Sequence, residues 1–342
     1  MNLELERERI FASAWQYVGW TDQLEQPGSF FTSIAGHIPI VVTRARDGEL
    51  RGFVNVCRHR GHLVAQGSGC RETLQCPYHA WTYELDGTLR RAPRSEREPT
   101  FDSSGLSLLP VAVDTLGPFV FVNPDPDAGA LHEALEGVPR MIVEGGLDLD
   151  GVRFHSHHEW EQPVNWKVAL ENYLECYHCS VAHPGFSKLI DVDPDSYSLL
   201  TGERTSSQLG PVRASALDGS GRAAYDPTGD VGQSQYHFIW PNTTINIAPG
   251  PQNISIERWV PVDAKTTVEV TDYFFGADLD ESTIQEIIAF DTQVAEEDVA
   301  LVQAVQKGLD SGAVNQGKLM VESEHLIASF QRNVYDAIAE AK

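Results

Sequence analysis

The spacing of hydrophobic residues changes along the chain, and the change predicts two regions of different structure. From Phe30 to about Val122, short apolar runs such as HIPIVVTRA, LRGFVNVC and PFVFVN alternate with Gly, Asp, Pro and Ser, which is typical of a small all-β domain. Residues 3–16 instead place apolar side chains at helical spacing and predict a short amphipathic helix. We expect this N-terminal segment, residues 1–16, to dock on the second region.

Helical and strand patterns are mixed after the turn-rich sequence Asn-Pro-Asp-Pro-Asp at 123–127. The strand patterns lie at 151–162, 235–248 and 253–275, and the helical patterns at 129–145, 166–180, 281–309 and 320–341. The polar stretch 190–232 predicts a long, mobile loop. The predicted fold class is therefore α+β: an all-β domain over 17–124, then a larger domain over 125–342 with an antiparallel sheet flanked by helices.

Net charge, apolar runs and cysteine content exclude several classes of partner and location for the protein. The formal net charge of −24 over 342 residues argues against nucleic acid or an anionic membrane surface, because both attract basic patches. The sequence has no apolar run that approaches the ~18–20 residues of a membrane span, and the charged start MNLELERERIF is unlike a signal peptide. We therefore expect a cytoplasmic protein whose five cysteines are thiols or metal ligands rather than a disulfide framework.

Two short motifs in the β region together carry two cysteines and two histidines. NVCRHRGH contains Cys57 and His59, and QCPYHAW contains Cys76 and His79, with sixteen residues between His59 and Cys76. Such a ligand set suits a tetrahedral zinc ion, or a [2Fe–2S] cluster in which two histidines replace two cysteines on one iron. The tight Cys-x-His spacing favours the cluster, with both cysteines on one iron and both histidines on the other.

The sequences CRHRGH and CPYHAWTY closely resemble the Rieske motif of the α-subunits of Rieske non-heme iron oxygenases. This resemblance implies a terminal oxygenase component that uses O2 and takes electrons from NAD(P)H through a separate flavin or iron–sulfur reductase. The sequence itself shows no glycine-rich dinucleotide motif, in agreement with a separate reductase. The resemblance also implies a mononuclear Fe(II) site downstream and a head-to-tail homotrimer. It leads us to expect a longer N-terminus, so this one is either naturally short or truncated.

Two further histidines, His178 and His183, lie in the sequence NWKVALENYLECYHCSVAHP. On an unbroken helix their spacing would place them more than about 100° apart. If the helix ends near Ser180, before Val181 and Pro184, both rings can converge on one ion. Two histidines and one carboxylate form the facial triad of non-heme Fe(II) oxygenases, which leaves positions open for O2.

The carboxylate of this triad is expected on the helix over 281–309, where Asp291, Glu296, Glu297 and Asp298 are candidates. At about 100° per residue, Asp298 lies in the middle of an apolar stripe, whereas Glu296 and Glu297 point away. The stripe consists of Ile287, Val294, Val302 and Val305. Because a buried lone carboxylate is costly unless it is paired or binds metal, we predict Asp298 as the ligand, with Asp291 as the alternative. The resemblance agrees, since EEDVALVQAVQKGL is similar to the third-ligand helix of the family.

The resemblance assigns roles to two more residues. In the family, an acidic residue at the place of Glu175 bridges the Rieske histidine of one subunit to the mononuclear iron of its neighbour, and Asn172 matches an asparagine near the iron. The family residue is more often aspartate. Glutamate in ENYLECYHC-like sequence resembles the subgroup that oxidises quaternary ammonium compounds such as carnitine and betaine. The sequence CYHC at 176–179 also fits a redox dithiol, although a thioredoxin-like strand does not precede it.

The substrate is predicted least directly. The strand sequence QYHFIWPNTTINIAPG suggests Phe238, Trp240 and Asn246 as pocket residues, and Tyr173, Tyr236 and Trp240 as an aromatic cage for a methylammonium group. The acidic chain and Glu175 favour an enzyme that hydroxylates or N-demethylates a small quaternary ammonium or betaine-like compound. A ring-hydroxylating or aromatic O- or N-demethylating oxygenase remains the alternative. Outside the oxygenases, a Rieske electron carrier and a zinc-stabilised binding protein stay open.

Overall fold

The computed structural model describes residues 3–339 apart from 214–215, 217–224, 227 and 315. Contacts between residues divide the chain into two compact units. The smaller unit is Glu6–Leu131, and the larger unit begins at His132 and also includes residues 3–5. None of the described helices has the length and apolar character needed to cross a membrane.

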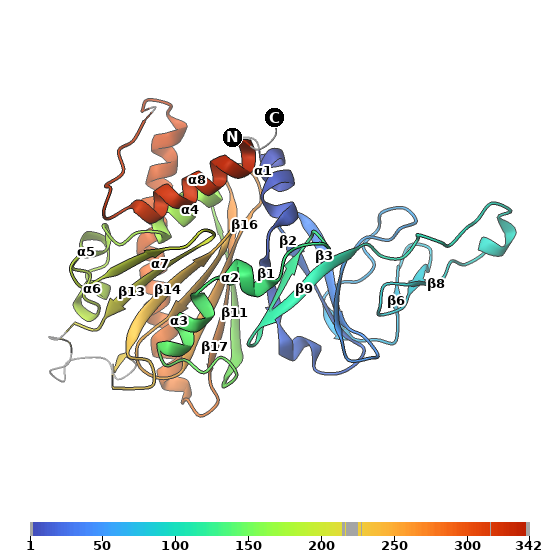
Figure 1. The fold of residues 1–342 in the computed structure, drawn as a ribbon, viewed down its shortest axis with the longest axis horizontal. Coiled ribbons are helices and arrows are strands. Elements are labelled where there is room, and N and C mark those ends of the chain that lie inside the picture. The colour runs from blue at the N-terminus through green and yellow to red at the C-terminus, as the bar shows by residue number, and fades with distance from the viewer. Residues whose placement is uncertain (1–2, 214–215, 217–224, 227, 315, 340–342) are drawn as a thin grey trace. The chain divides into compact units, whose positions relative to one another are not determined.

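Short antiparallel strands form the smaller unit (Figure 1). The first sheet has the strand order β1-β10-β9-β4-β3-β2-β5, and the second has the order β6-β7-β8. The strands are β1 (Gln16–Trp20), β2 (Ser29–Ala35), β3 (Ile38–Arg44), β4 (Leu50–Val54), β5 (Ser68–Cys70), β6 (Leu74–Gln75), β7 (Thr82–Tyr83), β8 (Leu89–Arg91), β9 (Pro110–Leu116) and β10 (Phe119–Asn123). The prediction of a small all-β domain is confirmed.

Strand β3 is apolar along most of its length because both of its faces are buried. Val41 belongs to the cluster of buried side chains that also contains Cys57 and Cys76, whereas Ile40 and Val42 belong to a second cluster. All three side chains are fully buried. Because successive side chains of a strand point to opposite faces, β3 contributes to two cores and reads IPIVVTR rather than alternating with polar residues.

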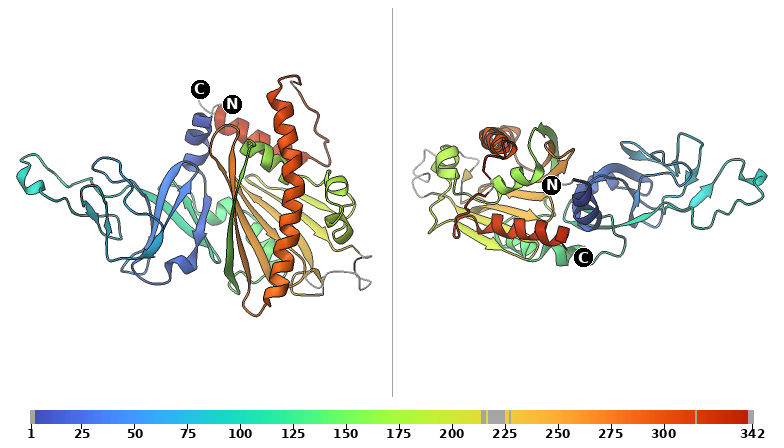
Figure 2. Two further views of the ribbon diagram at one scale, coloured as in Figure 1. Left: turned by 180° about the vertical axis from the view of Figure 1, so that it is seen from behind. Right: turned by 90° about the horizontal axis from the view of Figure 1, so that it is seen from above.

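The larger unit is one antiparallel sheet with helices packed around it (Figures 1 and 2). Its strand order is β11-β17-β16-β15-β14-β13-β12. The strands are β11 (Val152–Gln162), β12 (Ser198–Thr201), β13 (Thr205–Pro211), β14 (Gln233–Ile239), β15 (Thr243–Ile247), β16 (Asn253–Pro261) and β17 (Thr267–Gly276). The helices are α2 (Leu131–Leu135), α3 (Val138–Glu144), α4 (Trp166–Tyr173), α5 (Cys179–Ala182), α6 (Phe186–Leu189), α7 (Glu281–Asp310) and α8 (His325–Ala339). This architecture confirms the α+β prediction.

Helix α7 runs along one face of this sheet (Figure 2). It begins after Asp280, whose carboxylate accepts a hydrogen bond from the Thr283 N–H (3.1 Å) and so caps the first turn. Its apolar side chains Ile284, Ile287 and Ile288 pack into a buried cluster with residues from β17. The sheet face beneath α7 is therefore enclosed rather than solvated.

Three local predictions were wrong. The N-terminal helix is shorter than expected: α1 (Leu3–Arg9) is followed by a 3-10 turn at Phe11–Ser13. The helix predicted over 166–180 ends at Tyr173, and α5 is a separate turn. The segment 190–232 is not one loop, because it supplies β12 and β13, although several of its residues lie outside the described part. Strand β13, TSSQLGP, buries polar side chains, so it lacked the apolar alternation that signals a strand.

Candidate active site

Two loops of the smaller unit hold the predicted cluster ligands in the same backbone conformation. In each loop the cysteine N–H donates to the carbonyl five residues later, over 2.8 Å. In each loop the cysteine carbonyl also accepts from the N–H four residues later, over 3.0 Å. That fourth residue, Gly61 after Cys57 and Ala80 after Cys76, has a positive φ of 75° and 56° respectively. The loops therefore form a matched pair.

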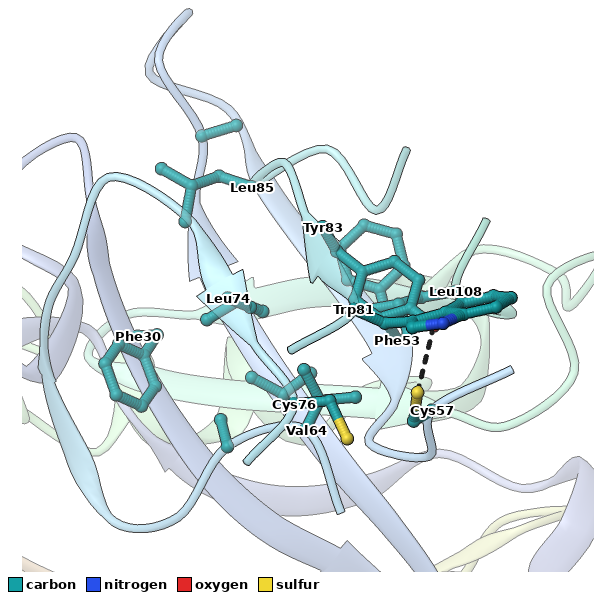
Figure 3. Packing of buried hydrophobic residues seen from close by; sticks show 13 residues of the cluster. Phe30, Phe53, Cys57, Val64, Leu74, Cys76, Trp81, Tyr83, Leu85 and Leu108 are labelled. Carbon is teal, nitrogen blue, oxygen red and sulfur yellow. Dashed lines mark hydrogen bonds between the residues drawn. The ribbon is translucent and has the colours of Figure 1, made fainter. Parts of the chain in front are cut away.

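The cysteines of these loops lie inside and the histidines outside. Cys57 and Cys76 are 3% and 2% exposed, within a cluster of buried side chains (Figure 3). His59 and His79 are exposed, with ring centroids 4.6 Å apart. The buried Tyr83 hydroxyl lies 3.3 Å from Cys57 Sγ. Sulfur ligands in the core and imidazoles at the surface fit a cluster whose two irons have different ligands.

A second ligand group lies in the larger unit. His178 and His183 flank the short helix α5, and Asp298 comes from α7. The Nε2 atoms of the two histidines are 3.1 Å apart. Asp298 Oδ1 lies 3.4 Å from the first and 3.1 Å from the second. The separate turn of α5 thus brings together the two histidines that an unbroken helix would have kept apart, and both face Asp298.

The convergence of these atoms fits a cation. Asp298 Oδ1 is buried and has no hydrogen-bond donor among the described residues. A carboxylate oxygen in that position needs a donor or a metal ion, and two imidazole nitrogens already face it. His178, His183 and Asp298 are also the donor set of a facial triad, so the residues present suit iron.

Each histidine of the trio is held from behind by a glutamate. His178 Nδ1 contacts Glu175 Oε1, and His183 Nδ1 lies 2.8 Å from Glu297 Oε2. Such contacts fix the tautomer and leave Nε2 free to bind a metal. The prediction that Glu297 points away is wrong, because its long side chain reaches sideways from α7 to His183. Glu296 is exposed, as predicted.

The charges of the trio are set by its own members and by the neighbouring residues Glu175 and Asn172. Burial alone would lower the pKa of His178, but the carboxylates of Asp298 and Glu175 raise it to about 9. Burial alone would raise the pKa of Asp298, but His178, His183 and the Asn172 amide lower it to about 2. Asp298 is therefore an ionised, partly buried carboxylate that attracts positive charge, and a metal ion would replace the protons.

Two details of α7 differ from the predicted stripe. Asp291 lies two turns before Asp298 and accepts a hydrogen bond from the Tyr273 hydroxyl (2.5 Å), away from the trio. Val305 is 52% exposed, whereas Ile287 and Val302 are each 4% exposed. Val305 therefore lies outside the buried face of the helix, which continues from Val302 to Gln306.

A cavity of about 170 Å³ adjoins the trio between the sheet and helices α4 and α7. Five further residues predicted for the site line it: Asn172, Tyr173, Glu175, Tyr236 and Asn246. Phe238 and Trp240 do not, since both pack against Phe330 of α8. Phe238 lies near the end of β14, and Trp240 lies in the turn that follows. The sequence of a single strand does not show that this region packs against α8.

The cysteines beside His178 form a disulfide, Cys176–Cys179. The other three, Cys57, Cys70 and Cys76, are free. The expectation of thiols or metal ligands thus fails for this pair, whose Cys-x-x-Cys spacing is short enough for the chain to close on itself.

Two protein-family models match this chain, and each match includes one of the two ligand groups. Residues 14–106 match the family model "Rieske [2Fe-2S] domain", and residues 149–340 match "Ring hydroxylating alpha subunit (catalytic domain)". The chain belongs to the α-subunits of the Rieske ring-hydroxylating oxygenases. The resemblance noted in the sequence is confirmed, and the zinc-protein and electron-carrier alternatives are set aside.

Three relatives cover nearly the whole chain. The carnitine monooxygenase oxygenase subunit of Acinetobacter baumannii is 35% identical, over 97% of this chain and 90% of the relative. The chloroplastic choline monooxygenase of Spinacia oleracea is 30% identical, over 95% of this chain and 73% of the relative. A crystal structure of the quaternary ammonium Rieske monooxygenase CntA with the substrate L-carnitine has a TM-score of 0.83 and 34% identity, over 98% of this chain and 91% of that one.

Membership of this family establishes the general chemistry. The chain is an oxidoreductase that incorporates oxygen from O2 into a small molecule, and its cofactors are a Rieske [2Fe–2S] cluster and a mononuclear iron. It works with a reductase that supplies electrons from NAD(P)H. The two ligand groups described above are the places in the described chain whose chemistry suits these cofactors.

Proposed function

We propose that the trio His178, His183 and Asp298 holds the mononuclear iron, that the two cysteine–histidine loops hold the cluster, and that the enzyme hydroxylates or N-demethylates a quaternary ammonium compound. The observation that carries this proposal is the position of the trio at the wall of a cavity rich in aromatic side chains. The carnitine and choline relatives, whose named substrates are both quaternary ammonium ions, support the substrate class.

The residues around the trio have separate tasks in this proposal. Bound iron supplies the activation of O2. Glu175 and Glu297 hold the two histidine rings in the orientation needed for ligation. The aromatic side chains of the cavity wall, among them Tyr173 and Tyr236, exclude water and can receive a methylammonium group on their ring faces.

We further propose that Glu175 carries the coupling between the cluster of one subunit and the iron of its neighbour in a head-to-tail homotrimer. Its carboxylate contacts the Nδ1 side of the His178 ring, so it is in direct contact with a proposed iron ligand. The reductase partner in this proposal carries flavin and an iron–sulfur centre, and the cytoplasmic location remains a prediction from the sequence.

Glu175→Ala separates this coupling role from simple support of His178. We expect the variant to hold both metals when it is supplied with saturating Fe(II), but to oxidise its reduced cluster slowly in a single turnover with O2 and substrate. Loss of the mononuclear iron would show that Glu175 only supports the histidine. An unchanged rate would reject the coupling role.

The substrate class is tested by turnover. The purified protein is combined with a surrogate reductase and NADH, and O2 consumption is followed with choline, γ-butyrobetaine and L-carnitine, and in parallel with indole and an aryl methyl ether. We expect oxidation of at least one ammonium compound and release of the corresponding aldehyde or amine. Oxidation of the aromatic compounds alone would replace this function by the ring-hydroxylating alternative.

A further inference from the structure

Three carboxyl groups line the cavity in addition to Asp298 and Glu175. Glu257 and Glu269 come from the neighbouring strands β16 and β17, and Asp291 comes from α7. Glu257 is 6% exposed and Glu269 is 4% exposed. Asp291 precedes Asp298 by two helical turns, which is about 10 Å along the helix axis. These three residues are here called the carboxyl cluster. Asp291 was considered from the sequence only as an alternative iron ligand, and Glu257 and Glu269 were not predicted.

The carboxyl cluster is bonded only to neutral groups. Glu257 accepts from the Thr244 hydroxyl (2.5 Å) and the Asn246 amide (2.7 Å). Glu269 accepts from the Gln162 amide (2.5 Å) through Oε2 alone, and Asp291 accepts from the Tyr273 hydroxyl through Oδ2 alone.

The described lining of the cavity contains no lysine or arginine. Buried carboxylates are normally paired with a cation, because an unpaired charge loses its hydration. Here burial, and then the nearby Asp291, raises the pKa of Glu257 to about 8, and burial raises the pKa of Asp291. No lysine or arginine of the described lining offsets this effect, so a bound cation would favour the ionised, negatively charged form of the cluster.

Aromatic rings stand beside the carboxyl groups. Trp259 and Trp160 are the register partners of Glu269 on the two strands that flank β17, and both line the cavity. Tyr273 lies on β17 as well, four residues after Glu269. Ring faces and carboxylates together attract an organic ammonium ion more strongly than either does alone.

We propose that the carboxyl cluster binds the positive charge of the substrate, and that the substrate is an organic ammonium ion without a carboxylate of its own. This inference rests on the proposed function and narrows it. A zwitterion would bring a further anion into a cavity whose described lining already holds several carboxyl groups and contains no lysine or arginine. The protein is therefore matched to amino-alcohol or ester ammonium ions rather than to betaines.

Matched pairs of substrates test the proposal on the complete enzyme with its metals and a surrogate reductase. Choline is compared with glycine betaine, and the methyl ester of γ-butyrobetaine is compared with γ-butyrobetaine. We expect kcat/KM to be roughly tenfold or more higher for the partner without the carboxylate. Equal or better turnover of the carboxylate partners would overturn this inference and leave the proposed function intact. Oxidation of aromatic compounds only would overturn both.

Binding of tetramethylammonium chloride gives a second measurement that does not depend on turnover. Glu257→Gln and Asp291→Asn are each expected to weaken its affinity by roughly tenfold, with an unchanged Rieske absorption spectrum as the check that the chain is folded. Glu296→Gln, an exposed glutamate on the same helix as Asp291, is the matched control and should bind as the wild type does. Unchanged affinity in both cluster variants would overturn the proposal. If those variants do not fold, the substrate pairs decide on the wild-type protein.

Discussion

The contact between Glu297 and His183 can be tested by its effect on iron affinity. The adjacent residue Glu296 provides the control. His183 is 2% exposed, and its Nδ1 lies 2.8 Å from Glu297 Oε2. Glu297→Ala removes the group that orients the ring and leaves a buried imidazole nitrogen without its partner. Loss of such a partner typically weakens metal binding by about 10- to 100-fold, or roughly 1.4–2.7 kcal/mol. Glu296→Ala removes the same kind of side chain one position earlier, where it is exposed.

The assay for this pair is competition for iron against a chelator of known affinity, followed together with the visible spectrum of the cluster. We expect Glu297→Ala to lose the mononuclear iron at a chelator concentration that spares Glu296→Ala and the wild type. The cluster spectrum should be the same in all three proteins, because Glu297 belongs to the larger unit. Equal iron affinity of the two variants would refute the role given to Glu297.

Further predictions concern the cluster, the cavity and the backbone. Tyr83→Phe removes the hydroxyl near Cys57 Sγ, so the reduction potential of the cluster should fall by roughly 40 mV if the bond is worth about 1 kcal/mol more in the reduced state; an unchanged redox titration would contradict this. Because the Glu257 carboxyl is ionised only as the pH rises through about 8, tetramethylammonium affinity should increase over that range, and the slope should disappear in Glu257→Gln. Gly87→Ala should destabilise the smaller unit by about 2 kcal/mol or more beyond Gly48→Ala in chemical denaturation. Both glycines have positive φ (84° and 89°), but only a Cβ at Gly87 would meet Phe53, at 2.4 Å.

The part of the site that the sequence predicts well is local in the chain. The two cysteine–histidine motifs each lie within a few residues, so their spacing alone indicates a ligand set and a family. His178 and His183 also lie in one motif, but their convergence depends on the end of α4 at Tyr173, which the sequence placed too late. Asp298 was identified because helical periodicity shows which residue faces the core.

The part that the sequence does not predict depends on side-chain reach and on contacts between distant strands. Glu297 was excluded because periodicity describes the direction of a Cβ and not the length of a glutamate side chain. Phe238 and Trp240 occupy a strand and turn that approach Phe330, and only the three-dimensional structure shows this contact.

The carboxyl cluster had a signal that was available. Glu257 alternates with Ser255 and Trp259 along β16, so the three side chains share one face of the sheet. A glutamate on the buried face of a strand is a signal of this kind, because a buried carboxyl group needs a hydrogen-bond donor or a ligand. The hydrogen bond of Glu257 with Asn246 could not be predicted from the sequence, because the bond depends on the pairing of β15 with β16.

Iron content measured together with the Rieske spectrum tests the central claim most directly. The wild-type protein should contain about three irons and about two acid-labile sulfides per chain, since a two-iron cluster is joined by one mononuclear iron. We predict that His183→Ala contains about two irons per chain, keeps the Rieske spectrum and has no turnover. A variant that retains the third iron, or retains turnover, would contradict the assignment of His178, His183 and Asp298 as the iron site.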